Sequence, residues 1–104
     1  MVPMDIGKIR EKVISGEYEF RRHALERANL RNINPLDVRH AILSGEVIEE
    51  YPDDPRGPSC LIWGKGRDKR DIHVVCGLSY GKVWIITVYL PEEKDWVNPK
   101  TRRR

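Results

Sequence analysis

Three basic side chains recur at every fourth position in the segment from Phe20 to Ile33. His23, Arg27 and Arg31 would share one face of an α-helix, because residues four apart are neighbours on a helix surface. Guanidinium groups bind phosphate through paired hydrogen bonds, and histidine transfers protons near neutral pH. The spacing therefore fits either a phosphate-binding face or an ordinary exposed face on which Glu26 pairs with its basic neighbours.

A second set of polar side chains lies in segments rich in β-branched residues. Strand alternation places His73 on the same face as Val75 and opposite Val74. The same alternation puts Tyr89 on one face with Ile85. His73 is then either a proton-transfer group or a core histidine that is hydrogen-bonded to a backbone carbonyl.

The sequence gives little support to metal or nucleotide chemistry. Asp53 and Asp54 are adjacent in a proline-rich turn, and no histidine or carboxylate pair stands at ligand spacing from them. The glycines at 64 and 66 lack the rest of a phosphate-binding loop. We therefore expect no metal and no cofactor. Cys60 and Cys76 lie in apolar runs, which predicts small buried hydrophobes rather than a disulfide or a metal pair.

The net charge of +3 comes from 19 basic and 16 acidic residues, and the basic ones include Lys100, Arg102, Arg103 and Arg104. The rest of the chain is close to neutral, so only a local basic patch can support a nucleic-acid role. We expect residues 97–104 to form a flexible basic tail. No apolar run reaches the roughly 18 to 20 residues of a membrane span and no signal segment is evident, which predicts a cytoplasmic protein without a membrane partner.

Start and stop signals predict three helices. The first begins after the capping residue Asp5 and ends at Gly16. A short extended piece from Tyr18 to Phe20 leads into the second, which spans about Arg22 to Leu30. An asparagine followed by a proline begins the third, over about Pro35 to Ser44, and a glycine ends it.

Four strand segments follow, each joined to the next by a short connection. They span about Val47–Tyr51, Ser59–Trp63, Ile72–Leu78 and Val83–Leu90. These connections are too short for parallel crossovers, which predicts a four-stranded antiparallel sheet. The predicted class is α+β, with three helices on one face of the sheet and the other face at least partly open. Residues 1–17 would form an N-terminal helical segment and residues 18–96 the single α+β domain, with Trp96 docking as an anchor.

The order of five segments resembles the domain-of-unknown-function family 4258. These segments read FRRHALERANLRNI, VRHAILSGEVIEE, YPDDPRGPSCLI, IHVVCG and IITVYLP. The match extends from about Tyr18 to Trp96. The resemblance implies a helix-then-sheet domain, similar in layout to the RelE and BrnT type of toxins and their metal-independent ribonuclease relatives. By position it carries over a polar surface made of His23, Glu26, Arg27, Glu49, Tyr51, His73 and Tyr89.

The leading functional prediction is a metal-independent endoribonuclease of toxin–antitoxin type. The RNA 2′-hydroxyl would attack the neighbouring phosphorus, which requires a base, an acid and cations at the phosphate. The candidates by role are His23 and His73 as acid and base in either order, Arg27 and Arg31 as phosphate clamps, and Tyr89 or Glu49 as an orienting or alternative proton-transfer group. The prediction implies RNA or the ribosome as a partner, together with a cognate antitoxin protein.

The alternative is a non-catalytic module that binds nucleic acid or protein through the open sheet face. It requires the same surface but no proton-transfer pair. A dimeric structural protein that exposes the strands of Trp63 and Trp84 is a third interpretation. The positions of His23 and His73 separate the first two. A working pair must converge within about 8 Å of one phosphate position, and opposite faces of the sheet would exclude it.

Overall fold

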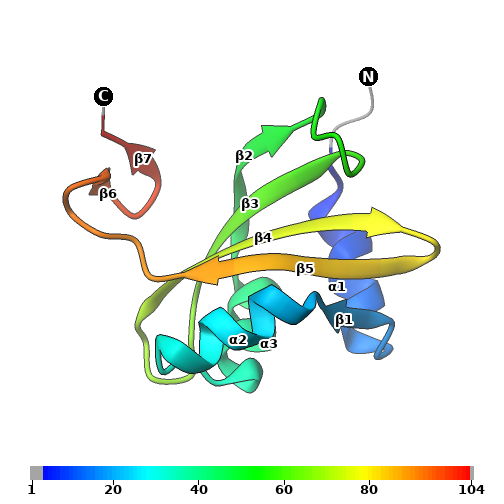
Figure 1. The fold of residues 1–104 in the computed structure, drawn as a ribbon, viewed down its shortest axis with the longest axis horizontal. Coiled ribbons are helices and arrows are strands. Elements are labelled where there is room, and N and C mark those ends of the chain that lie inside the picture. Colours follow the sequence, from blue (N-terminus) through cyan, green and yellow to red (C-terminus); the bar gives the residue numbers. More distant parts are fainter. Residues whose placement is uncertain (1–3, 104) are drawn as a thin grey trace.

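Three helices lie against one face of a five-stranded sheet in the computed structural model, which describes residues 4–103 (Figure 1). They are α1 (Ile6–Ile14), α2 (Arg22–Leu30) and α3 (Pro35–Ser44). The predicted α+β class with three helices is confirmed. Within residues 4–103, none of the helices has the length and apolar character that a membrane span needs.

The sheet is mixed and has five strands, whereas four antiparallel strands were predicted. In spatial order they are β1 (Tyr18–Phe20), β5 (Lys82–Tyr89), β4 (Asp71–Ser79), β3 (Ser59–Lys65) and β2 (Glu46–Tyr51). Neighbours among β2 to β5 are antiparallel, but β1 pairs in parallel with β5, with Tyr18 opposite Val83. The prediction considered only connections between consecutive strands. Two helices and three strands separate β1 from β5 in the chain, a length that permits parallel pairing.

Side-chain caps fix the start of two helices at the predicted residues. Asp5 Oδ1 accepts a hydrogen bond of 2.9 Å from the Gly7 amide, and Asn34 Oδ1 accepts one of 2.8 Å from the Leu36 amide. Gly16 follows α1 with a left-handed φ of +82°. The two side-chain caps accept hydrogen bonds from backbone amides at the helix starts, and the left-handed glycine allows the chain to leave α1. Short sequence signals at the helix ends therefore predict where these helices begin and end.

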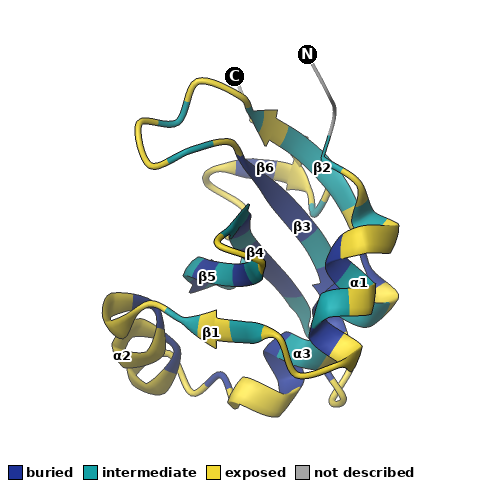
Figure 2. Ribbon diagram, turned by 90° about the vertical axis from the view of Figure 1, so that its right-hand side faces the viewer, coloured by how far each residue is buried: buried dark blue, intermediate teal, exposed yellow. Residues whose placement is uncertain are grey.

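The hydrophobic core lies between the helices and the sheet. Ile72 and Cys76 on β4 point toward it, as alternation predicts, and both are fully buried. The small side chains of Ala24 and Ala28 bring α2 close to β5. Cys60 is free, buried and directly opposite Cys76 in the sheet. Figure 2 shows that buried residues follow the central strands, while the outer sides of the helices are exposed.

A small ribbon follows the main sheet. It consists of β6 (Trp96–Asn98) and β7 (Thr101–Arg102), which pair with each other and not with the five-stranded sheet. In Figure 1 it lies beyond the end of β5, at the upper left. The ribbon occupies much of the segment expected to be a flexible tail, residues 97–104, of which Arg104 lies outside the described residues.

Candidate functional site

A β-bulge in β5 determines which side chains reach the sheet face opposite the helices. The pairing shifts by one residue between Val75 and Cys76 on β4, so Ile86 on β5 has no opposite partner. Tyr89 consequently lies on the face away from the helices, while Ile85 is in the core. The prediction that these two residues share a face is wrong, because strict alternation does not account for an inserted residue.

Three predicted candidates converge on this face, together with Tyr51. The ring of His73 contacts that of Tyr89 across β4 and β5, with centroids 5.1 Å apart. Glu49 comes from β2, and its Oε1 accepts a hydrogen bond of 2.6 Å from the Tyr51 hydroxyl. Its charge lies close enough to act on the pKa of His73. We call Glu49, Tyr51, His73 and Tyr89 the acid–base cluster.

The C-terminal ribbon covers the acid–base cluster. The Trp96 ring packs on His73 with centroids 4.4 Å apart, so this tryptophan docks as an anchor. Arg102 donates hydrogen bonds of 3.2 and 3.0 Å to the two carboxylate oxygens of Glu49. The carbonyl oxygen of Pro99 lies 2.7 Å from His73 Nε2, so Nε2 carries the proton and donates it. The segment beyond Trp96, expected to be a free tail, is folded back on the sheet.

The second ring nitrogen of His73 is unpaired. Nδ1 has no hydrogen-bond partner among the described residues, although the side chain is fully buried. Such an atom costs a fold roughly 1–3 kcal/mol. Burial lowers the pKa of His73, so the imidazole is neutral at pH 7 and Nδ1 is an unused acceptor.

The other groups of the cluster have defined protonation states at pH 7. Hydrogen bonds from Arg102 lower the pKa of Glu49, so this group is a carboxylate. Burial raises the pKa values of Tyr51 and Tyr89, so both phenols keep their protons. The cluster thus combines a carboxylate, a neutral imidazole and two phenols, with the carboxylate and imidazole held under the ribbon.

His23 is remote from this cluster. Its side chain on α2 is 81% exposed, and Nδ1 lies 3.6 Å from Oε2 of Glu26. His73 is instead fully buried between Trp96 and Tyr89. The structure therefore does not bring the predicted acid–base pair of His23 and His73 together. Spacing along α2 predicts which helix residues share a face, but it does not determine which side of the sheet they reach.

We expect His23→Ala to leave stability almost unchanged, within about 0.5 kcal/mol, because an exposed pair with Glu26 contributes little. The contrasting substitution His73→Ala removes a buried ring that packs on Trp96, and should cost at least about 2 kcal/mol. Urea titrations followed by circular dichroism measure both values. Equal losses for the two variants would contradict the assignment of His23 to a solvent-exposed face.

Arg31 stabilises the edge of β5. Its Nη1 donates a hydrogen bond of 2.6 Å to the carbonyl oxygen of Val88. The pairing of β1 with β5 ends at Ile85, so this guanidinium satisfies a carbonyl that β1 does not reach. Arg31 also borders a hollow of about 470 Å³ with Tyr89 and Trp96. The predicted phosphate clamp therefore has part of its hydrogen-bonding capacity in use.

Arg27 borders a different hollow, on the sheet face opposite the helices. This hollow has a volume of about 490 Å³ and is lined by Arg27, Tyr51, Asp54, Pro55, Arg56, Val75, Ile86 and Thr87. We call it the arginine depression. Within residues 4–103 the ion pairs of α2 involve its other charged residues and leave the Arg27 guanidinium without a carboxylate partner. Of the three basic residues that recur at every fourth position, Arg27 is thus the one available to a ligand on this face.

Arg56 supplies a second guanidinium to the arginine depression and is fixed by Asp54. The Asp54 carboxylate accepts hydrogen bonds of 3.0 Å from Nε and 2.9 Å from Nη2 of Arg56. It also accepts one of 2.7 Å from the buried Ser59 hydroxyl. The hydrogen bonds from Arg56 hold the pKa of Asp54 well below its usual range. The depression therefore combines one anchored and one unpaired guanidinium.

Sequence reasoning missed Arg56, Trp96 as part of the cover, and Arg102. A signal for Arg56 exists, because an aspartate two residues before an arginine in a proline turn can accept from its amide, as Asp54 does at 3.0 Å. Arg102 meets Glu49 across 53 residues of chain, and no local pattern marks that contact.

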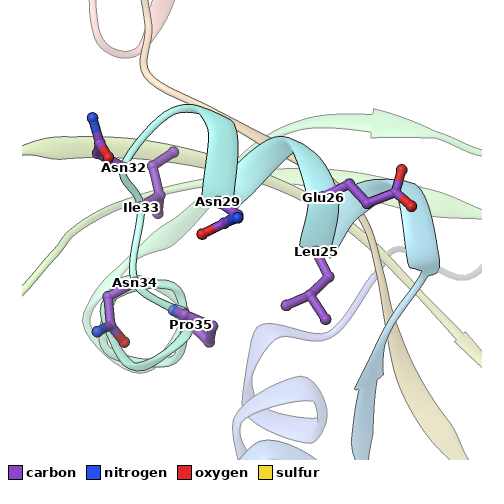
Figure 3. Close-up of a pocket in the computed structure, with 7 residues that line it drawn as sticks. All are labelled: Leu25, Glu26, Asn29, Asn32, Ile33, Asn34 and Pro35. Carbon is purple, nitrogen blue, oxygen red and sulfur yellow. The ribbon is translucent and has the colours of Figure 1, made fainter.

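Other parts of the molecule offer less chemistry. A hollow of about 640 Å³ lies between α2 and the start of α3, where Leu25 and Asn29 project from one helix and Pro35 from the other (Figure 3). Its lining holds a single titratable side chain, Glu26. Within residues 4–103 there is also no group of three or more His, Cys, Asp or Glu residues that could hold a metal ion.

Comparisons with known proteins identify the family. The model of the family described as "Domain of unknown function (DUF4258)" matches residues 20–90. A protein of Buchnera aphidicola subsp. Baizongia pistaciae named translation initiation factor IF-2 is 38% identical over 63 residues, which are 60% of this chain but 7% of that protein. No solved structure matches. Because the family model covers well over half of the sequence, this chain belongs to the DUF4258 family.

Proposed function

We propose that this domain binds single-stranded RNA on the sheet face opposite the helices, with a phosphate held between Arg27 and Arg56. The observation that carries the proposal is the arginine depression itself, in which two guanidinium groups from separate elements border one hollow. Paired donors of this kind suit a phosphate oxygen pair. Thr87 and Tyr51 add hydroxyl-bearing side chains to the lining.

A partly exposed aromatic side chain near the arginine depression favours a nucleic-acid strand, rather than a free phosphate ion, as the ligand. Trp84 lies on β5 directly opposite Gly77, on the same sheet face, and is partly exposed. The Arg21 guanidinium lies 4.5 Å and the Lys82 ammonium 5.9 Å from the centre of its ring. Stacking of bases on aromatic side chains contributes about 1–3 kcal/mol per base in single-strand binding. A strand with a base at Trp84 would continue along β5 toward Thr87.

Local charge on this face favours an anion, although the chain without its last residues is close to neutral. In the described part of the chain, neither Arg21 nor Arg27 forms an ion pair, and Asp54 is already engaged with Arg56. Phosphate binding by such groups is sensitive to salt, because each contact releases counterions. The proposal therefore rests on a local patch and not on the basic C-terminus.

The test is fluorescence anisotropy with a labelled, unstructured RNA of about ten nucleotides at several salt concentrations. We expect Arg27→Ala to weaken binding about tenfold and to lower the salt dependence by about one counterion, because one phosphate contact is lost. Arg39→Ala is the matched control, since Arg39 lies on α3 in the helical layer. Equal affinities for the parent and Arg27→Ala would refute the site, and equal losses in both variants would show that binding is not confined to this face.

Metal-independent RNA cleavage of toxin–antitoxin type is the second candidate. One observation favours it: Glu49, His73 and Tyr89 converge on the same face as the arginine depression, and Tyr51 belongs to both. The expected likeness to RelE and BrnT toxins supports this candidate, together with the ribosome and an antitoxin as partners. The pair of His23 and His73 is not part of it. Cleavage would require RNA, because the 2′-hydroxyl is the nucleophile, so DNA of the same sequence is the control substrate.

A further inference from the structure

We infer that residues 92–103, which we call the strap, form an autoinhibitory cover over the acid–base cluster, and that release of the strap completes an RNA-cleaving site. The inference rests on the proposed binding of RNA at the arginine depression. It concerns a different place, because the covered groups are Glu49, His73 and Tyr89. It also predicts a change in RNA cleavage, whereas the proposed function predicts RNA affinity.

The strap is held to the sheet largely by side chains. Its two short strands pair with each other, and neither extends the five-stranded sheet. The attachments are Trp96 on His73, the Pro99 carbonyl on His73 Nε2, Arg102 on Glu49, and Lys100 on Glu46 at 2.7 Å. A cover of this kind can leave without breaking any hydrogen bond between the strands of the main sheet.

The strap makes its contacts with the groups of the acid–base cluster that could transfer protons. The guanidinium of Arg102 spans both carboxylate oxygens of Glu49 and also lies 4.6 Å from the centre of the Trp96 ring. The imidazole of His73 is enclosed between Trp96 and Tyr89. One cation, one aromatic ring and one carbonyl of the strap thus contact the Glu49 carboxylate and the His73 imidazole of the sheet, as a ligand from the same chain would.

The unpaired Nδ1 of His73 provides an independent indication. It is fully buried and has no partner among residues 4–103, so the covered state does not use it. Buried polar atoms are nearly always paired, and each exception calls for an explanation, of which a catalytic role is one. Release of the strap removes Trp96 and the Pro99 carbonyl from the ring, and the inference requires that water or a substrate hydroxyl then reach Nδ1. The charged groups that act on the ring are Glu49, Asp71 and Arg102.

The open cluster contains the groups that RNA cleavage by its own 2′-hydroxyl requires. Nδ1 of neutral His73 accepts the 2′-hydroxyl proton while the bond from O2′ to phosphorus forms. The bond from phosphorus to O5′ breaks, and the Tyr89 phenol gives its proton to O5′. The imidazolium then returns a proton to the tyrosinate through water. The products are a 2′,3′-cyclic phosphate and a 5′-hydroxyl, so no water, metal or oxidant is consumed.

Two variants of the full chain test the cover. Arg102→Glu places a carboxylate against Glu49, and Trp96→Ala removes the ring on His73, so each opens the strap by a different route. Lys94→Ala is the matched control, because Lys94 lies in the strap and its ion pair within residues 4–103 is with Glu92, at 3.7 Å. Histidine NMR resonances followed against pH report whether His73 has become accessible. The substrate is a twelve-nucleotide unstructured RNA in chelator, with binding measured separately.

We expect His73 to titrate close to its ordinary pKa of about 6.5 in either opened variant, and at lower pH in the parent and in Lys94→Ala. Cleavage should rise about 100-fold over the parent, the lower end of what a positioned acid–base group supplies. His73→Gln added to an opened variant should remove cleavage and leave binding intact.

The outcomes separate the two proposals. An accessible His73 with RNA bound but uncleaved would overturn the inference and leave the proposed RNA site standing. A His73 that stays buried in both opened variants would overturn the assignment of the strap contacts as the cover. Absence of RNA binding by the parent protein would refute the proposed function directly, whatever the state of the strap.

Discussion

Gly64→Ala is expected to prevent stable folding. A Cβ atom at this position would lie 1.9 Å from the carbonyl oxygen of Ala41 and 2.7 Å from its Cα. These are backbone atoms of α3, so no side-chain rotation relieves the clash and the helix must move off β3. We expect a loss of more than about 4 kcal/mol, beyond the usual range for single substitutions and comparable to the whole stability of many small domains.

A second glycine substitution serves as the matched control for Gly64→Ala. Gly81, in the turn between β4 and β5, has a φ of +75°, and a Cβ atom added there would meet no other atom within 4 Å. Gly81→Ala should therefore cost only the strain of a left-handed backbone, about 1–2 kcal/mol. Urea denaturation followed by far-ultraviolet circular dichroism compares the two. If Gly64→Ala lost no more than Gly81→Ala, the close contact of α3 with β3 would be disproved.

Asp54→Ala is expected to cost about 2 to 4 kcal/mol and to weaken RNA binding. The side chain is 7% exposed and accepts hydrogen bonds from Arg56 and from the buried hydroxyl of Ser59. Its removal leaves that hydroxyl without its partner and frees Arg56 from its fixed position. Chemical denaturation and anisotropy measure the two effects. Asp53→Ala, at the exposed neighbouring carboxylate, is the control and should change neither.

The contribution of Asp54 should also depend on pH in a defined direction. Its folded-state pKa is depressed, so the carboxylate stabilises the fold fully above the unfolded value of about 3.9 and loses this effect as pH falls through the folded value. Between about pH 5 and pH 2 the parent should therefore lose more stability than Asp54→Ala. If the free energies of unfolding of the parent and of Asp54→Ala fell in parallel over that interval, the depressed pKa of Asp54 would be contradicted.

Local signals in the sequence were sufficient for the helices and most strands. The helix from Pro35 to Ser44 has the predicted bounds, because the cap, the proline and the following glycine act within a few residues of the helix ends. The strand from Asp71 to Ser79 follows from alternation in an apolar run. Tyr18–Phe20 was predicted only as an extended piece, since its pairing partner lies more than 60 residues later and no local pattern encodes that pairing.

The candidate site was less predictable than the fold. His23 and Arg27 lie on one helix as the spacing predicted, and Arg31 follows directly as the residue that ends it, yet each meets a different environment: solvent, the arginine depression and the edge of β5. The convergence of Glu49 with His73 depends on tertiary packing. It also depends on a C-terminal ribbon that composition alone identified as a tail, because an arginine-rich segment looks solvated until its partner carboxylate is known.

The extra residue in β5 acts like a frameshift in the pattern of the strand. If β5 paired without a bulge, Ile86 would lie opposite Val75, and every later position would change sides, turning Tyr89 toward the helices and Val88 toward the strap. Deleting Ile86 would instead leave Ile85 opposite Cys76 and Thr87 opposite Val75, so Val88 and Tyr89 would keep their present sides. The surface at the end of β5 therefore depends on a bulge that takes up one unpaired residue.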